Sequence, residues 1–178
     1  MPENISVILV IDTLATEFVQ VAKRNIKALI DTLEEGDRFA IVAFDTNRYI
    51  FYPDSRRLAT ISNPKDDPET NAAKQIINAL VFNGEKTSIC GGLEQAIGLL
   101  KNITSKCGVV LLSDGWDNAE TLEDVISSLT PVIPVFTSVL GPASNTLLLR
   151  EIAEKTGGEF YLELQPVTMM QISNKIRS

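Results

Sequence analysis

The fold is decided by Ile5–Thr16, which reads ISVILVIDTLAT. Seven apolar or small residues, rich in β-branched side chains, run into a single acid, Asp12. Such a run predicts a strand that is buried on both faces of a sheet. Ligands of an open α/β sheet bind outside the carboxyl ends of its strands, so Asp12 stands where a binding site is expected.

A second stretch, Gly108–Asp114, repeats this design with the sequence GVVLLSD. It is again an apolar strand that ends in an acid. If the two strands are neighbours in the sheet, Asp12 and Asp114 face the same crevice. Either acid alone has a simpler interpretation, because Asp is a favoured N-cap of a following helix. The pair favours a site.

The chain has 178 residues and a formal net charge of -7, with no histidine. Its length suits one domain, which we expect to span residues 1–178. The acidic balance argues against nucleic acid as the main partner, because phosphate binding needs clustered Lys and Arg. Without histidine, the commonest general base and the commonest zinc ligand are missing. We expect no signal peptide and no membrane insertion by this domain, since no apolar run reaches about 18 residues.

Strand and helix patterns alternate along the chain, which predicts an α/β fold. Strands are expected at Ile5–Ile11, Arg38–Phe44, Tyr49–Tyr52, Gly108–Ser113, Val132–Val139 and Glu159–Leu164. Helices are expected at Phe18–Leu33, Asn71–Val81, Ile89–Leu100, Leu122–Leu129, Thr146–Thr156 and Val167–Ile176. Gly36 is interpreted as the C-cap of the first helix, and Ser62–Thr70 as a loop. The architecture is a three-layer, doubly wound sandwich around a mostly parallel six-stranded sheet with one antiparallel edge strand.

Two further features concern the cysteines and the strand that contains a proline. Cys90 and Cys107 flank a helix of about 12 residues, which would hold its ends about 18 Å apart. A disulfide needs Cα atoms within about 7 Å, so we expect two free thiols. Pro134 lies inside the predicted fifth strand and suggests an early or bulged position.

Three loops are expected to meet at the carboxyl end of the sheet. They are Asp12–Thr16, Gly84–Ser88 and Asp114–Asn118, and they offer carboxylates and hydroxyls without imidazole. An oxygen-only set suits a hard cation such as Mg²⁺, Mn²⁺ or Ca²⁺. Ser88 is more simply read as the N-cap of the helix that starts at Ile89.

These motifs resemble the von Willebrand factor A (VWA) domain family over nearly the whole chain. In that family an Asp-x-Ser-x-Ser motif, a later Thr and a distant Asp form a metal-ion-dependent adhesion site, or MIDAS. Asp12 matches the first Asp, Thr16 the second Ser, Thr87 the later Thr and Asp114 the final Asp. The resemblance implies strand order 3-2-1-4-5-6 with strand three antiparallel. It also implies a non-enzymatic adhesion or protein-interaction module that binds a partner's Glu or Asp carboxylate through Mg²⁺, Mn²⁺ or Ca²⁺.

A closer likeness is to the subgroup found in calcium-activated chloride channel regulators. It rests on the stretches TSICGGL, LLSDGWDN and TGGEFY. Secreted members of the family imply an extracellular or cell-surface location, although intracellular A domains exist too.

Two departures from the family pattern weaken the expected metal site. Leu14 stands where the family has its first Ser ligand and offers no oxygen. Lys86, next to Thr87, would bring an ammonium toward the cation position, where like charges repel. We therefore expect a degenerate site that binds metal weakly or not at all. Partner contacts would then fall to a rim of Trp116, Lys86 and Asp117, with Trp116 as the natural anchor.

Two other classes of function are open at this point. A structural VWA domain of a larger surface or secreted protein would need no metal. A P-loop NTPase is suggested by the GEKT sequence that ends at Thr87, but Leu80 and Glu85 occupy the two glycine positions of that motif. No G-x-G-x-x-G follows the first strand, and no histidine is present to activate a nucleophile.

Overall fold

The computed structural model describes residues 3–13, 19–44, 49–53, 57–81, 88–115, 127, 133–140, 145–162 and 165–178. Its strands are β1 (Ile5–Asp12), β2 (Arg38–Phe44), β3 (Tyr49–Tyr52), β4 (Ala59–Thr60), β5 (Lys106–Ser113), β6 (Val135–Val139) and β7 (Phe160–Tyr161). Its helices are α1 (Val19–Asp31), α2 (Pro68–Ala79), α3 (Ile89–Leu100), α5 (Thr146–Thr156) and α6 (Pro166–Arg177). The predicted helix Leu122–Leu129 lies outside the described residues, except for Ser127.

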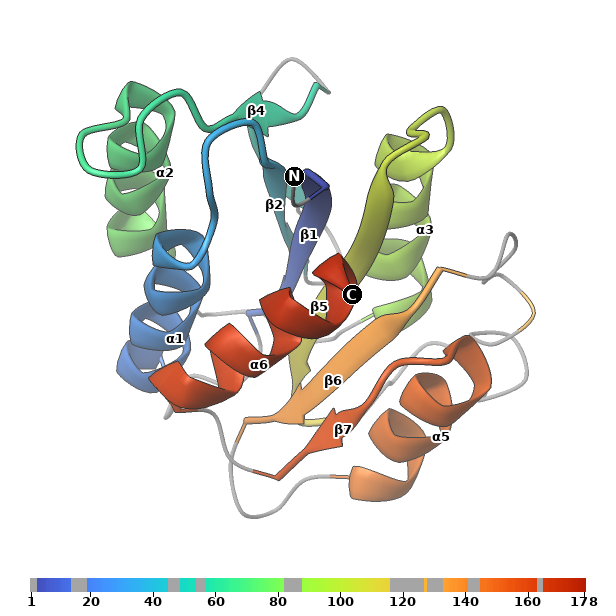
Figure 1. Ribbon diagram of the computed structural model, residues 1–178. Coiled ribbons are helices and arrows are strands. Elements are labelled where there is room, and N and C mark those ends of the chain that lie inside the picture. The colour runs from blue at the N-terminus through green and yellow to red at the C-terminus, as the bar shows by residue number, and fades with distance from the viewer. Residues whose placement is uncertain are drawn as a thin grey trace.

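The strands form one sheet in the order β3-β2-β1-β5-β6-β7 (Figure 1). β1 pairs in parallel with β2 and β5, and β5, β6 and β7 follow in parallel, whereas β3 pairs antiparallel with β2. This confirms the predicted order and the antiparallel edge strand. The two-residue strand β4, which the sequence did not reveal, also pairs antiparallel with β2.

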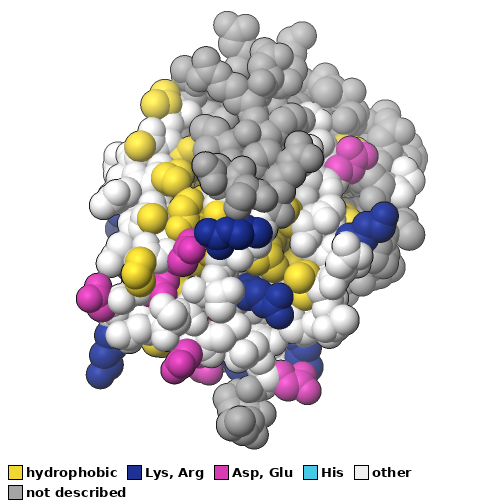
Figure 2. Space-filling model, turned by 90° about the horizontal axis from the view of Figure 1, so that it is seen from above, with side chains coloured by type: hydrophobic (Ala, Val, Ile, Leu, Met, Phe, Trp, Pro, Cys, Tyr) yellow, Lys and Arg dark blue, Asp and Glu magenta, His cyan; other side chains and the backbone are white. Residues whose placement is uncertain are grey.

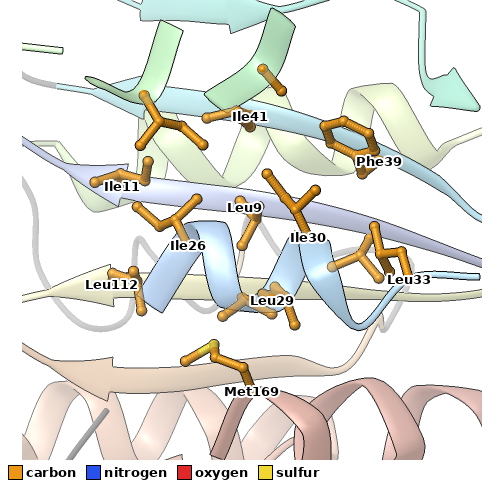
Figure 3. Close-up of a cluster of buried hydrophobic side chains, with 14 of the residues drawn as sticks. Leu9, Ile11, Ile26, Leu29, Ile30, Leu33, Phe39, Ile41, Leu112 and Met169 are labelled. Atoms are coloured by element: carbon orange, nitrogen blue, oxygen red, sulfur yellow. The ribbon is translucent and has the colours of Figure 1, made fainter. Parts of the chain in front are cut away.

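Two hydrophobic clusters cover the two faces of the sheet. On one face, α1, α2 and α6 pack against Leu9 and Ile11 of β1, and Figure 3 shows these side chains meeting those of α1 and Met169 of α6. On the other face, α3 and α5 pack against Ile8 and Val10. All eight residues of β1 are buried, which explains why its sequence does not alternate between apolar and polar residues.

Several predicted boundaries were wrong for local reasons. The loop Ser62–Thr70 ends earlier, because Asp67 caps α2 and Pro68 occupies its first turn, where a missing N–H costs nothing. α1 ends at Asp31, so Gly36 is not its C-cap; Gly36 lies in the next turn with φ of 90°. β6 begins only after Pro134, since proline cannot donate a ladder hydrogen bond.

A glycine ends α5, and the predicted N-cap of α3 is confirmed. Gly157 ends α5 in the left-handed conformation with φ of 82°. Ser88 caps α3, its Oγ accepting a hydrogen bond from the amide of Gly91 at 3.1 Å. Neither Cys90 nor Cys107, both of which the structure describes, is part of a disulfide.

Candidate functional site

Asp12 and Asp114 lie at the same end of the sheet, on two adjacent central strands. β1 and β5 run parallel with Ile11 opposite Leu112, so Asp12 comes level with Ser113 and Asp114 follows directly. The side chain of Asp12 is completely buried, and Asp114 is half-buried. The structure therefore brings together the two predicted acids that it describes.

A hydrogen-bonded chain links the two strand ends through a serine. Ser113 Oγ donates to Asp12 Oδ2 at 2.8 Å, and the Gly115 amide donates to Ser113 Oγ at 3.0 Å. Ser113 itself is completely buried. Sequence reasoning missed this residue; its only signal was a hydroxyl directly before the acid that ends the strand.

Neighbouring elements hold both strand ends in place. On the β2 side, the amide and hydroxyl of Thr13 both donate to the carbonyl of Phe44, at 3.1 and 3.0 Å. On the β6 side, the amide of Leu140 donates to the Ser113 carbonyl at 2.9 Å. At the start of α5, the amide of Asn145 donates to the Asp114 carbonyl at 2.7 Å. Thr13 thus anchors β1 to β2.

The turn after Asp114 depends on a glycine. Gly115 has φ of 79°, and a Cβ placed there would lie 2.3 Å from the carbonyl oxygen of Asn145. Only glycine combines this left-handed conformation with so close an approach. The turn that follows Asp114 therefore packs directly against the backbone at the start of α5.

The amino-terminal end of α3 packs close to the same edge of the sheet. A Cβ on Gly92 would lie 2.8 Å from Cδ1 of Phe44, so the first turn of α3 rests directly on the end of β2. Thr87 precedes this turn in the sequence by one residue. Thr87 itself lies outside the described residues. The same is true of the other predicted site and rim positions, which are Leu14, Thr16, Lys86, Trp116 and Asp117.

The donor set of the described residues is compatible with a hard cation but does not complete a site for one. Asp12 and Asp114 supply carboxylate oxygens at one end of the sheet, and Ser113 already orients one of them. Among the described residues, no three His, Cys, Asp or Glu side chains are grouped closely enough to hold a metal. A metal here would need further oxygens from hydroxyls or water, which Mg²⁺ accepts.

At the opposite end of the molecule, the described charged side chains are of both signs. Viewed from above, the described Lys and Arg side chains are interspersed with Asp and Glu and with hydrophobic atoms (Figure 2). Among the described side chains on this face, charges of one sign do not form an extended region that would attract a polyanion.

An open, mostly parallel sheet covered by helices on both faces, with acids at the ends of its central strands, defines the doubly wound class of ligand-binding α/β domains. A family model of the von Willebrand factor type A domain matches residues 5–162, so the chain belongs to this family. No curated protein sequence matches the chain significantly.

Several solved structures share this fold. The von Willebrand factor type A protein from Catenulispora acidiphila is 27% identical with a TM-score of 0.79, over 98% of this chain and 41% of that one. An aerotolerance-related membrane protein from Bacteroides fragilis is 16% identical with a TM-score of 0.73, over 97% and 98% of the two chains. Proximal thread matrix protein 1 from the mussel byssus, with zinc in its MIDAS motif, is 17% identical with a TM-score of 0.65, over 98% and 45%.

The coverage of the relatives and the lengths of the helices each add one fact about this chain. The chain spans less than half the length of the Catenulispora protein. In the part of the chain that the structure describes, no helix has the length and apolar character needed to cross a bilayer.

Proposed function

We propose that this domain is a non-enzymatic protein-interaction module whose binding end is the carboxyl edge of the sheet, with a degenerate MIDAS at its centre. The observation that carries the proposal is the buried Asp12 carboxylate beside the Ser113–Asp114 strand end. A completely buried acid at the end of a central strand stands where α/β sheets bind ligands.

The residues that would hold a metal are Asp12, Thr16, Thr87 and Asp114, by their match to the family motif. A bound divalent cation would supply a positive charge to which a partner's Glu or Asp carboxylate could bind. The zinc in the MIDAS motif of the mussel byssus protein supports a cation at this place in the fold. Leu14 offers no oxygen, and Lys86 adds a positive charge, so we expect Mg²⁺ or Mn²⁺ to bind weakly or not at all.

Titration calorimetry with Mn²⁺ and Mg²⁺ tests the metal site. For the wild type we expect an affinity weaker than low-micromolar, and Leu14→Ser should raise it about tenfold by returning a ligand oxygen. Leu147→Ser, at a residue 63% exposed on α5, is the matched control and should change nothing. Low-micromolar binding by the wild type would contradict the degenerate site. An unchanged affinity in Leu14→Ser would move the defect to Lys86, to be tested by Lys86→Ala.

The partner-binding rim is proposed to consist of Trp116, Lys86 and Asp117. Capture of proteins from a lysate by the immobilised domain, with and without EDTA, separates the candidate functions. Capture that EDTA abolishes supports a metal-dependent carboxylate ligand. Capture that EDTA leaves intact but Trp116→Ala removes supports the rim alone. No capture supports the alternative, a structural VWA domain of a larger surface or secreted protein.

Catalysis has little support. VWA domains are usually non-catalytic. The last described element before Gly84 is the helix α2, whereas the lysine loop of a P-loop NTPase follows a strand. The subgroup of calcium-activated chloride channel regulators and an extracellular location stay predictions from the sequence motifs alone.

A further inference from the structure

The side chain of Ser113 joins both strand ends of the candidate site. Its hydroxyl has a single proton, which it donates to the carboxylate of Asp12 at 2.8 Å. Its lone pairs accept the amide of Gly115, at 3.0 Å. Both bonds are buried. The same oxygen atom therefore fixes an acid on β1 and the turn that follows β5.

We propose that Ser113 is the positioning residue of the candidate site, an inference that rests on the proposed function. Its hydroxyl holds the Asp12 carboxylate and the turn that carries Asp114 in one mutual arrangement. Asp114 lies between Ser113 and Gly115 in the sequence. The hydrogen bond from the Gly115 amide to Ser113 Oγ therefore closes the turn around Asp114.

The turn is also fixed from its other side. The amide of Asn145 donates to the Asp114 carbonyl at 2.7 Å, and Gly115 lies against the Asn145 carbonyl. The Ser113 carbonyl is bonded to Leu140 in the adjacent strand segment. With these contacts in place, removal of the Ser113 hydroxyl removes two hydrogen bonds, one to the Asp12 carboxylate and one from the Gly115 amide, and leaves the outer contacts of the turn intact. The effect of that removal should be local.

Such a residue matters for binding because carboxylates that are already oriented need not be ordered when a ligand arrives. Hydrogen-bonding partners of metal ligands typically change metal affinity 10- to 100-fold when they are removed. A site in which Leu14 already costs one ligand depends more strongly on the geometry of the remaining acids.

The test compares Ser113→Ala with Ser113→Thr and with Ser138→Ala. Ser138 is the matched control, because it is a completely buried strand serine whose Oγ donates to the Tyr161 carbonyl at 3.0 Å, away from the acids. Each variant is first checked by thermal unfolding. If Ser113→Ala does not fold, Ser113→Cys, whose thiol is a weak donor, replaces it.

Two quantities are measured on the whole chain: Mn²⁺ affinity by calorimetry, and the exchange rate of the Gly115 amide by NMR. We expect Ser113→Ala to weaken Mn²⁺ binding about tenfold and to speed Gly115 exchange at least tenfold. Ser113→Thr, which keeps the hydroxyl, should restore both to within about threefold of the wild type, and Ser138→Ala should change neither. Equal effects of Ser113→Ala and Ser138→Ala would show a merely structural role and overturn the proposal.

Failure of the proposed function is distinguishable from failure of this inference. The affinity series is repeated in the Leu14→Ser background. If Mn²⁺ binds in neither background, and Lys86→Ala does not restore binding, the metal site is wrong, and Gly115 exchange alone decides whether Ser113 holds the turn. Unchanged Gly115 exchange in Ser113→Ala overturns the inference whatever the metal does.

Discussion

Each end of the sheet has a completely buried acid, Asp37 at the amino end and Asp12 at the carboxyl end, and the described hydrogen-bond partners of the two acids differ in kind. At the amino end, Asp37 accepts the backbone amides of Ile5 and Glu34 at 2.9 and 2.7 Å. It also forms a two-pronged ion pair with Arg177 of α6, at 3.1 and 2.6 Å. At the carboxyl end, the Asp12 carboxylate accepts a hydrogen bond from the hydroxyl of Ser113 at 2.8 Å.

The difference separates a structural acid from a candidate binding acid. Asp37 ties the start of β1, the turn before β2 and the end of α6 together, and an arginine balances its charge. A buried charge that is paired and fully hydrogen-bonded is stable as it stands. Asp12 lies at the end of the sheet where α/β domains bind ligands. The amino end should therefore control stability, and the carboxyl end binding.

The largest expected effect is at the amino end. Arg177→Met should lower the free energy of unfolding by about 3 kcal/mol, because it leaves the Asp37 carboxylate buried without its cation. Thermal unfolding should show a midpoint roughly 10 °C lower. Mn²⁺ affinity should stay unchanged, and the double variant Arg177→Met/Asp37→Asn should recover part of the loss. A change in Mn²⁺ affinity of more than about threefold would break the proposed separation of the two ends.

The next effect is at the carboxyl end and should change both properties. Gly115→Ala should cost about 2 kcal/mol, because the new Cβ would clash with the Asn145 carbonyl in a left-handed conformation. It should also weaken Mn²⁺ binding by displacing Asp114. Gly157→Ala is the matched control, with φ of 82° but no atom within 4 Å of its Cβ. Chemical unfolding that shows equal costs for the two variants would remove the role assigned to the clash.

A third effect depends on pH and again concerns the amino end. Asp67 is buried beside the β4–α2 connection, and desolvation alone would raise its pKa. Hydrogen bonds from the amide and hydroxyl of Ser62 and of Thr70 outweigh this and lower the pKa from its ordinary 3.8 to about 2.

A carboxylate with a lowered pKa in the folded state stabilises the protein above its unfolded pKa and loses that contribution as pH falls. The stability of the wild type should therefore include about 2 kcal/mol from Asp67 above pH of about 4, lost as pH falls toward about 2. Asp67→Asn, which keeps an N-cap side chain, should lower the free energy of unfolding by about 1.5 kcal/mol at pH of about 7. It should also make that free energy fall less steeply as the pH decreases from about 4 to about 2. Urea unfolding at several pH values measures this dependence. If the free energy of unfolding of Asp67→Asn falls as steeply with decreasing pH as that of the wild type, Asp67 is not the source of the acid dependence.

The smallest effect belongs to an exposed pair between α1 and α2. Lys74 and Asp31 are 2.5 Å apart, with 31% and 59% of their side chains exposed. Lys74→Met should change the free energy of unfolding by less than about 0.5 kcal/mol, because solvent screens such pairs. A loss of unfolding free energy as large as that of Arg177→Met would show that burial of the acid does not determine how much its ion pair contributes to stability.

Much of the fold could be predicted because its signals are local. The apolar run before Asp12 and the similar run before Asp114 identified the central strands, and β3 was placed at the antiparallel edge. β4 was missed because a two-residue strand has no pattern of its own. The start of α2 was misplaced because Asp67 and Pro68 resemble a loop in sequence but form a helix cap in the structure.

The candidate site could be predicted only in part. Asp12 and Asp114 were identified by their position after apolar runs, and the structure describes both. Ser113 and Thr13 were not, since their roles depend on atoms about 100 and 31 positions away in the chain. The predicted Thr16, Thr87 and rim residues stay predictions.

The sequence by itself determined the central strands, their burial and the acids at their ends, because hydrophobic periodicity and chain order are properties of neighbouring residues. Only the tertiary structure decided which side chains the buried acids meet. Asp37 meets Arg177 across 140 positions of sequence, and Asp12 meets Ser113 across 101. Electrostatic compensation depends on distance in space, and that distance is set when the sheet and its helices pack together.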